Sequence, residues 1–207
     1  SRYQRQQVTD YLAWQAEIVR EYAQPHQFVT HNFDFEWRGY SFGVQPRVDH
    51  FAASQALDIA GVDIYHPSQK HLTGREIAFG GAITRALKGG NNYFVLETQA
   101  QAFSHVASGA AMVSYWHWHS IHNSFETYWK GLLSHDFSRN ATWQEATTIG
   151  ADFARLSPKL VGLRAENDVA LLISNEAMDA LNQFRPGDTQ GNIYNDIFRR
   201  FHDALYD

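Results

Sequence analysis

Acidic and aromatic side chains follow several short apolar runs of the sequence. Glu97 comes directly after one run, Asp63 and Tyr65 end another, and Trp116 and Trp118 end a third. Carboxylates beside indole and phenol rings suit glycoside hydrolysis. In that reaction one carboxyl group attacks or stabilises the anomeric centre, another manages protons, and rings contact the apolar face of the sugar. A satisfied structural carboxylate is the alternative interpretation at these positions.

The elements that must position these residues alternate between helix and strand. Apolar residues at helical spacing predict helices, and short apolar runs predict buried strands. The predicted helices span Tyr3–Tyr22, Val48–Asp58, Thr73–Leu87, Ala102–Ala107, Trp143–Leu156 and Tyr194–Tyr206. The predicted strands span Gln27–His31, Ala60–Tyr65, Tyr93–Leu96, Ala111–Trp116 and Asp168–Ser174, with a loop over Asn32–Pro46. This alternation indicates an α/β protein of parallel βαβ units, in which reactive residues gather at the carboxyl ends of the strands.

Four βα units amount to half of a (β/α)8 barrel. Half a barrel leaves two strand edges without a partner, and such edges need cover. Three arrangements therefore stay open. The chain is one piece of a larger protein, or it pairs with another half, or its sheet is open and doubly wound.

Composition argues against several classes of partner. The 207 residues carry a net charge of −5, which offers no basic face to a nucleic acid. No apolar run approaches the roughly 20 residues that span a bilayer. The chain has no cysteine, so neither a disulfide nor a thiolate zinc site is possible. We expect a soluble protein that binds no nucleic acid, no membrane and no cofactor.

Three histidines lie close together after the fourth predicted strand. His117 and His119 are two residues apart and share a face if the segment is extended, and His122 follows them. Such a cluster could indicate a metal, since imidazole is a common ligand. No third ligand is obvious, so we interpret these histidines as structural or sugar-site residues and expect no metal site.

Several separated motifs, in the same order along the chain, resemble those of the glycoside hydrolase family 42 β-galactosidases, especially the bifidobacterial type. These motifs are Thr30–Phe33, Asp63–Tyr65, Tyr93–Gln99, Ser114–His119, Ser124–Gly131, Glu145–Gly150 and Asp168–Ser174. The resemblance covers essentially the whole chain. It implies a C-terminal half of a TIM barrel, about strands 5 to 8, over residues 1–163. The start of a flavodoxin-like α/β trimerisation domain follows over residues 164–207.

The same resemblance implies roles for individual residues. Glu97 falls on the nucleophile of a retaining β-galactosidase, which hydrolyses terminal β-D-galactosides by double displacement. Glu126 falls on a residue that binds galactose hydroxyls, and Tyr65 and Trp129 match positions that line the same subsite. The family pattern favours Trp118 as a ring that faces the sugar. The resemblance also implies a homotrimer, and a cytoplasmic location fits the absence of cysteine.

Two features depart from the family pattern. The family's general acid/base is a glutamate at the end of the fourth barrel strand, and this chain begins in the helix after that strand, so the proton donor is absent. Gln99 also passes almost directly into Gln101–Ser104, where the family has a Trp-bearing loop, and we expect residues to be missing there. The alternatives are a non-catalytic sugar-binding or assembly fragment, a β-glucosidase and an α-L-arabinopyranosidase.

Overall fold

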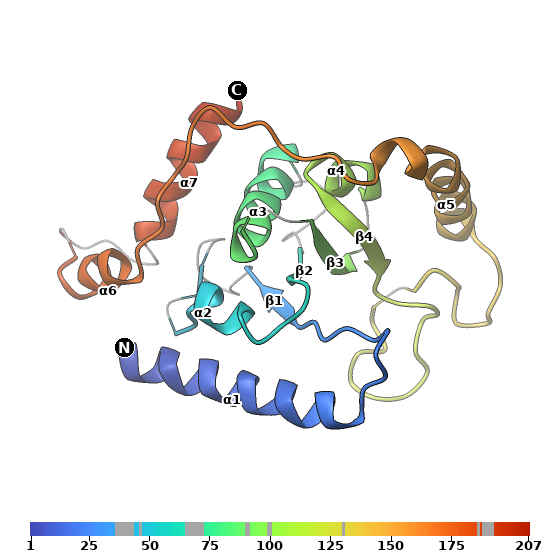
Figure 1. The fold of residues 1–207 in the computed structure, drawn as a ribbon. Coiled ribbons are helices and arrows are strands. Elements are labelled where there is room, and N and C mark those ends of the chain that lie inside the picture. Colours follow the sequence, from blue (N-terminus) through green and yellow to red (C-terminus); the bar gives the residue numbers. More distant parts are fainter. Residues whose placement is uncertain are drawn as a thin grey trace.

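The computed structural model describes residues 1–35, 44–45, 47–64, 73–89, 92–98, 101–129, 131–185, 187 and 193–207. Its helices are α1 (Arg2–Tyr22), α2 (His50–Ser54), α3 (Gly74–Leu87), α4 (Ala102–Ala107), α5 (Ala141–Leu160), α6 (Asn175–Gln183) and α7 (Ile193–Tyr206) (Figure 1). Its strands are β1 (Asn32–Asp34), β2 (Gly61–Asp63), β3 (Tyr93–Thr98) and β4 (Ala110–Tyr115). All six predicted helices are present, and α6 is an addition that the sequence analysis missed.

The sheet confirms the predicted α/β class. Its four strands are all parallel and lie in the order β1-β2-β3-β4, the order in which they occur along the chain. A doubly wound sheet reverses its strand order at a switch point, whereas successive strands of a (β/α)8 barrel lie side by side. The strand order therefore favours a barrel segment over an open doubly wound sheet.

The two faces of the sheet differ in polarity because side chains alternate along each strand. On β1, Phe33 is buried whereas Asn32 and Asp34 are exposed. The apolar side chains of the strands share one core cluster with residues of α2 and α3, including Phe79 and Ile83 of α3. The helices thus cover one face of the sheet, and the polar side chains of β1 lie on the other.

The strand predicted over Gln27–His31 is absent from that segment. The first strand, β1, begins directly after it, at Asn32. The polar groups of this segment bond to the segment before β2, since the Val29 N–H donates to the Asp58 carboxylate at 2.7 Å and the Thr30 hydroxyl donates to the Ile59 carbonyl at 2.9 Å. The ladder with β2 begins only at Asn32. Part of the predicted loop over 32–46 is therefore β1.

The segment 168–174 was also predicted as a strand, and it forms none. A strand needs a neighbour for its backbone N–H and C=O groups, but the side chain of Leu172 is 90% exposed and Val169 is 57% exposed. The Ser174 N–H instead donates to the Tyr194 hydroxyl at 2.7 Å. The segment is an extended connection, which crosses from α5 to α6 in Figure 1.

Helix α5 is longer than predicted, since it continues through Pro158 to Leu160. Proline removes one backbone donor from a helix, and this loss matters least near an end that is open to solvent. None of the residues of α5 is buried. The Pro158 signal therefore marks the last turn of the helix and not its end.

The C-terminal helices share the core of the sheet. Met178 of α6 and Tyr194 of α7 are buried in the same cluster as Phe33 and Val62, and the buried Asn195 amide donates to the Val44 carbonyl at 3.0 Å. Residues 175–206 are thus packed against the barrel segment. The division at residue 163 stays a prediction from the family resemblance.

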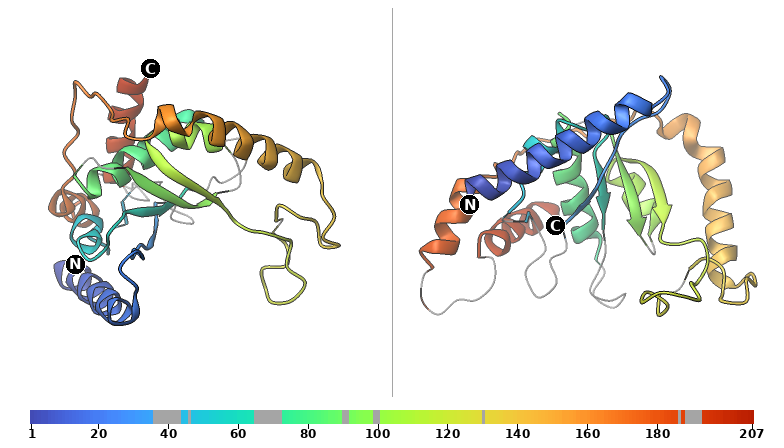
Figure 2. Two further views of the ribbon diagram at one scale, coloured as in Figure 1. Left: turned by 45° about the vertical axis from the view of Figure 1, so that its right-hand side comes forward. Right: turned by 90° about the horizontal axis from the view of Figure 1, so that it is seen from below.

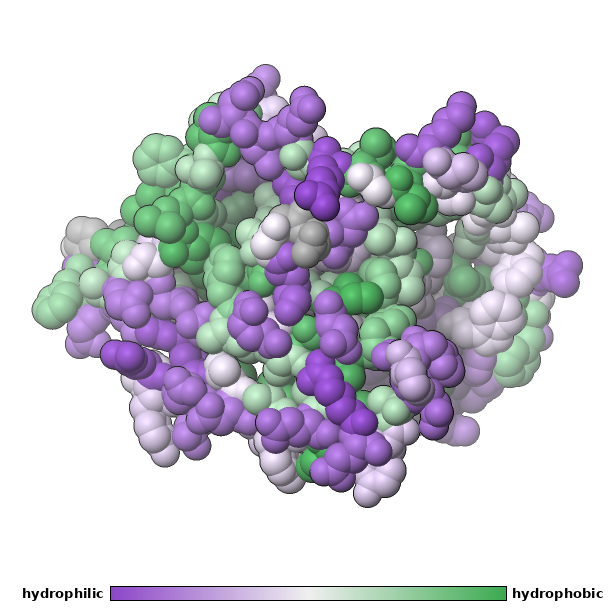
Figure 3. All heavy atoms as spheres, viewed as in Figure 1, coloured by the Kyte–Doolittle hydropathy of each residue, from purple (hydrophilic) through white to green (hydrophobic). Residues whose placement is uncertain are grey.

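The outer side of the C-terminal helices is apolar. Ile197, Phe201 and Leu205 of α7 are 43%, 63% and 55% exposed, and Phe184 after α6 is 80% exposed. Figure 3 shows hydrophobic side chains gathered on the side of the molecule where Figure 1 places α7. Within the described ranges, no helix is both long and apolar enough to cross a membrane.

Two helical glycines give a matched test of this packing. A Cβ on Gly81 of α3 would collide with the Tyr93 hydroxyl and lie 3.0 Å from Ser108 Cβ, whereas a Cβ on Gly150 of α5 would meet nothing within 4 Å. We expect Gly81→Ala to lower the free energy of unfolding by about 1–3 kcal/mol through overpacking. Gly150→Ala should raise it by up to about 1 kcal/mol through helix propensity. Urea unfolding of both variants measures the difference, and equal effects would contradict the packing described for α3.

Candidate active site

Glu97 lies near the carboxyl end of β3. Val95 of the same strand is fully buried, and Glu97 itself is half-buried. Its partner in the register of the neighbouring strand is Asp63, the last residue of β2. The parallel sheet therefore brings two carboxyl groups together at its carboxyl edge, where the sequence analysis expected the reactive residues.

The Asn32 amide joins these two carboxyl groups. Its Nδ2 donates to Glu97 Oε1 at 2.8 Å and to Asp63 Oδ2 at 3.1 Å. The sequence analysis placed Asn32 at the start of a loop and assigned it no role. The available signal was the alternation of polar residues around the buried Phe33, which marks a strand with Asn32 and Asp34 on one face.

Asp63 is an unusual carboxyl group. Only 9% of the residue is exposed, and its Oδ1 atom is buried with no hydrogen-bond partner among the described residues. Burial raises the pKa of Asp63 to about 7, with a further increase from the Glu97 charge, a decrease from the Asn32 hydrogen bond and an increase from Asp34. At mildly acid pH, Asp63 is therefore a neutral acid beside Glu97.

This arrangement suits a nucleophile with support from its neighbours. The hydrogen bond from Asn32 orients Oε1 of the half-buried Glu97 carboxylate. Asp63 lies on the strand next to Glu97, bonds to the same amide and is only 9% exposed, so we do not assign it as the proton donor. The described residues thus provide one oriented carboxylate, Glu97, and the second carboxyl group that a glycosidase needs as proton donor is not assigned to any of them.

Glu126 and Trp129 lie in the segment that follows β4. They share a turn in which the Trp129 N–H donates to the Glu126 carbonyl at 3.2 Å, and the Trp129 ring packs on Tyr128 with ring centroids 5.0 Å apart. Figure 2 shows the segment 116–140 extending away from the sheet beyond the end of β4. The turn therefore follows the same edge of the sheet as Glu97, but its described contacts are local.

Trp118 packs on the helix that follows this segment. Its ring meets Trp143 of α5 edge to face, with centroids 5.4 Å apart, and the residue remains 58% exposed. Trp116 is less exposed, at 36%. The more open of the two indoles is thus the one that the family pattern favours, and its role stays a prediction. Tyr65, the remaining predicted substrate residue, lies outside the described residues.

The histidines after β4 pack against an aromatic ring. His119 and His122 both contact Phe137, with ring centroids 4.7 and 5.6 Å away, and the His119 ring Nδ1 lies 2.9 Å from the Ser120 carbonyl oxygen. The part of the chain that the structure describes contains no group of three or more histidine or acidic residues arranged to hold a metal ion. These contacts fit a structural role in shaping the segment.

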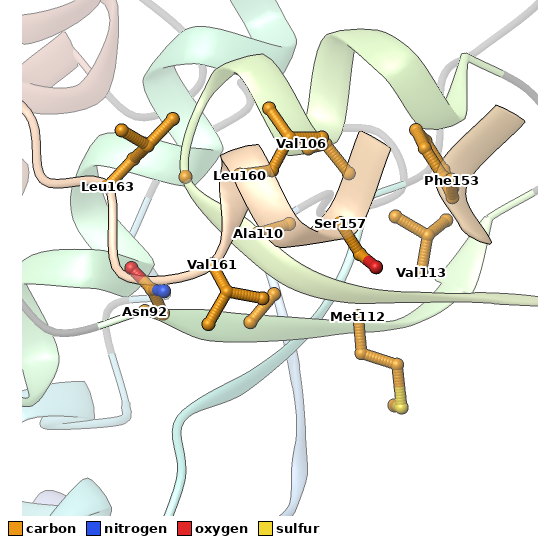
Figure 4. Close-up of a pocket in the computed structure, with 12 residues that line it drawn as sticks. Asn92, Val106, Ala110, Met112, Val113, Phe153, Ser157, Leu160, Val161 and Leu163 are labelled. Atoms are coloured by element: carbon orange, nitrogen blue, oxygen red, sulfur yellow. The ribbon is translucent and has the colours of Figure 1, made fainter. Parts of the chain in front are cut away.

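A hollow of about 260 Å³ lies elsewhere, between β4 and α5. Figure 4 shows Phe153, Ser157 and Leu160 of α5 gathered around it with Val113 of β4 and Val106 of α4. Its lining is mostly apolar and includes no acidic side chain. We therefore assign the chemistry to the carboxyl edge of the sheet and not to this hollow.

The crossover between β3 and β4 is short. Only residues 99–109 connect the two strands, whereas residues 64–92 connect β2 to β3. The six-residue helix α4 fits this link, and Gln101 before it has a left-handed backbone with φ of 65°. A parallel crossover normally needs a dozen or more residues, so the rim of the sheet next to Glu97 carries an unusually small loop.

A parallel sheet in sequential order, with a carboxylate at its carboxyl edge, is the arrangement of a (β/α)8 barrel segment that carries a site. The comparisons with known proteins agree. The model of glycoside hydrolase family 42, described as β-galactosidase, matches residues 1–104 and 98–156, and the chain belongs to this family. The two matches meet at the short link between β3 and α4, where the sequence analysis expected residues of the family to be missing.

The relatives of known sequence and structure are much longer than this chain. The β-galactosidase of Arthrobacter sp. is 25% identical in an alignment 184 positions long that covers 77% of this chain and 25% of the relative. The cold-adapted β-galactosidase of Rahnella sp. R3 superposes with a TM-score of 0.81 at 20% identity, over 99% of this chain and 32% of its own. The enzyme of the haloarchaeon Halorubrum lacusprofundi gives a TM-score of 0.77 at 22% identity, over 97% and 33%. The chain thus spans about a quarter to a third of the length of these relatives.

Proposed function

We propose that this chain carries half of the active site of a retaining β-galactosidase, with Glu97 as the nucleophile. The Glu97 carboxylate attacks the anomeric carbon and forms a glycosyl ester, while the glycosidic oxygen leaves with a proton. Water then cleaves the ester. The proton donor comes from a part of the barrel that this sequence does not contain. The observation that carries this proposal is the oriented Glu97 carboxylate at a strand end within the family match.

A solved relative has a catalytic glutamate. One structure of Gan42B, a family 42 β-galactosidase from G. stearothermophilus, is a catalytic mutant in which a glutamate is replaced by alanine. A carboxylate is therefore part of the catalytic machinery of that protein. In the present chain Asp63 and Glu97 both lie at strand ends and accept hydrogen bonds from Asn32, but Asp63 is buried, whereas Glu97 is half-buried and falls on the nucleophile position of the family motif.

We propose substrate contacts from the segments that follow the strands. Glu126 accepts hydrogen bonds from galactose hydroxyls, and Trp129 and Tyr65 line the same subsite. Trp118 offers its exposed ring to the apolar face of the sugar. The positions of the β4 segment beyond the sheet edge support this assignment, since closure of the barrel would bring such segments over Glu97.

We also propose that the complete enzyme is a cytoplasmic homotrimer and that residues 164–207 begin its second domain. The proposed second domain is supported by the exposed apolar side chains of α7 and of the segment 168–174, because such side chains normally pack against further structure. The trimer and the location rest on the family resemblance.

A second function has one observation in its favour. The polar face of the sheet, with Asn32 and Asp34, is open among the described residues, and a half-open barrel holds a catalytic constellation poorly. Such a chain could bind a galactoside without hydrolysing it.

Turnover assays separate these functions. We expect the 207-residue chain alone to leave a nitrophenyl β-galactoside uncleaved, and a full-length enzyme that contains it to release nitrophenol. The first sugar product should be β-galactose by proton NMR, since retention follows from double displacement. Matched β-glucoside and α-L-arabinopyranoside substrates test the two related specificities. Turnover of lactose by the chain alone would refute the missing proton donor, because a sugar leaving group needs a proton, and an inverted product would refute Glu97 as a nucleophile.

A further inference from the structure

The nucleophile of the proposed function has a second carboxyl group beside it, to which neither the sequence motifs nor the reaction assigns a role. We propose that Asp63 is a positioning residue for Glu97, which acts as a neutral carboxylic acid and shares the Asn32 amide with it. This inference rests on the proposed function because it takes Glu97 as the attacking group.

The geometry of the Asn32 amide carries the first step. The planar amide has two N–H groups on one nitrogen, and that nitrogen bonds to Glu97 Oε1 at 2.8 Å and to Asp63 Oδ2 at 3.1 Å. Both donors of Asn32 are therefore occupied by carboxyl groups. A movement of either carboxyl group breaks a bond to the amide that also holds the other.

The surroundings of Asp63 carry the second step. Besides the Asn32 amide, the charged groups among the described residues that act on it are Glu97 on β3 and Asp34 on β1, and both are acidic. Its Oδ1 atom is buried without a described partner. An ionised Asp63 would thus have one neutral donor and two negative neighbours, whereas a neutral acid avoids both repulsions. Consistently, burial first and the Glu97 charge second raise the pKa of Asp63 to about 7.

The consequence for the reaction follows from competition for one amide. While Asp63 is neutral, the shorter hydrogen bond of Asn32 goes to the charged Glu97 carboxylate and fixes it at the strand end. When Asp63 loses its proton, it competes for the same amide and repels Glu97. The attacking carboxylate then leaves its position, and glycosyl transfer slows as the pH rises through this ionisation.

Carboxyl-carbon NMR of the 207-residue chain tests the protonation directly. We expect one aspartate signal to titrate near neutral pH and to disappear in Asp63→Asn. Glu97→Gln should lower the midpoint of that signal because it removes a negative neighbour, and Asp34→Asn should lower it less, in the order of the two contributions. An Asp63 signal that titrates near the ordinary aspartate value of 3.8 would overturn the inference.

Thermal unfolding supplies an independent readout with a defined sign. The folded pKa of Asp63 lies above its unfolded value, so the folded chain holds a proton that the unfolded chain has released, and stability falls with rising pH between about 4 and about 7. Asparagine has no such proton. The Tm of Asp63→Asn should therefore rise relative to wild type across this window. A constant Tm difference would count against a neutral Asp63.

Kinetics of the full-length enzyme test the positioning role. A dinitrophenyl β-galactoside is the useful substrate, because its leaving group needs no protonation. Ionisation of the proton donor then no longer affects kcat/KM, and the pH profile reports on the nucleophile and its neighbours. We expect kcat/KM of the wild type to decline above neutral pH and this decline to vanish in Asp63→Asn. Coincident profiles would refute the positioning role. If no galactoside is cleaved at all, the proposed function fails, while the NMR and Tm results still decide whether Asp63 is neutral.

Discussion

Glu97→Gln is expected to lower kcat for a nitrophenyl β-galactoside by at least about 10³-fold in a full-length enzyme that contains this chain. Glutamine keeps the size of the side chain and can still accept the Asn32 hydrogen bond, so the fold at the strand end should persist. It has no negative charge and cannot form the glycosyl ester. Steady-state kinetics give the loss, and an unchanged Tm of the variant would show that it is chemical and not structural.

Two further measurements fix the role of this residue. Glu17 is exposed on α1, so Glu17→Gln is a matched control that should retain wild-type turnover. For Glu97→Ala, added azide should restore cleavage of a substrate with a good leaving group and yield α-galactosyl azide, because azide attacks from the face that the nucleophile has vacated. A β-galactosyl azide product would assign Glu97 to acid/base catalysis.

Asp179→Asn should be the most destabilising of the proposed conservative substitutions, with a loss of about 3 kcal/mol in the free energy of unfolding. Arg5 of α1 donates to both carboxylate oxygens of Asp179 of α6, at 3.0 and 2.9 Å. The Arg5 side chain is only 5% exposed, whereas that of Asp179 is 39% exposed. Loss of the carboxylate charge therefore removes the bidentate partner of a buried guanidinium, and the charges of Glu176 and Asp49 act on it more weakly. Urea unfolding of the 207-residue chain measures the loss.

The chain offers a close control for this ion pair. Asp152 is also 39% exposed, but its partner Arg155 is 69% exposed on the same helix. Asp152→Asn should change the free energy of unfolding by less than about 0.5 kcal/mol, as exposed pairs usually do. Similar losses for both variants would show that burial of Arg5 does not govern the effect.

The pH dependence of the Arg5–Asp179 pair has the opposite sign to that of Asp63. The hydrogen bond from Arg5 lowers the pKa of Asp179 from its ordinary value of 3.8. The contribution of the ion pair to the free energy of unfolding is therefore complete above pH 3.8 and is lost as the pH falls through the lowered pKa of Asp179. At mildly acid pH the pair is intact while Asp63 still holds its proton.

Local patterns predicted most of the fold. The helix α3 begins after Thr73, where the Thr73 N–H and hydroxyl both donate to Glu76, and it ends before Gly89, whose φ is +70°. These signals are local, so the sequence shows them directly. The strand end at Glu97 was predictable for the same reason, since the apolar run and the carboxylate are adjacent.

The remaining features depend on contacts between distant segments. The role of Asn32 needs the register of three strands, which places it against Asp63 and Glu97. The failed strand at 168–174 has the composition of a strand, but no described strand lies beside it to complete a ladder. The neutral state of Asp63 likewise follows from burial and from two acidic neighbours, neither of which is adjacent to it in the sequence.

The short crossover between β3 and β4 also has a consequence for the order of folding. Closing a loop costs about 0.6 kcal/mol more for each doubling of its length. Residues 99–109 form a much shorter loop than residues 35–60 or 64–92, which join the other strand pairs. The pairing of β3 with β4 is therefore the most local in the sheet, and we expect β3–α4–β4 to form early in folding. The strand that carries Glu97 would then form its contacts first, and β2 and β1 would add to it in turn.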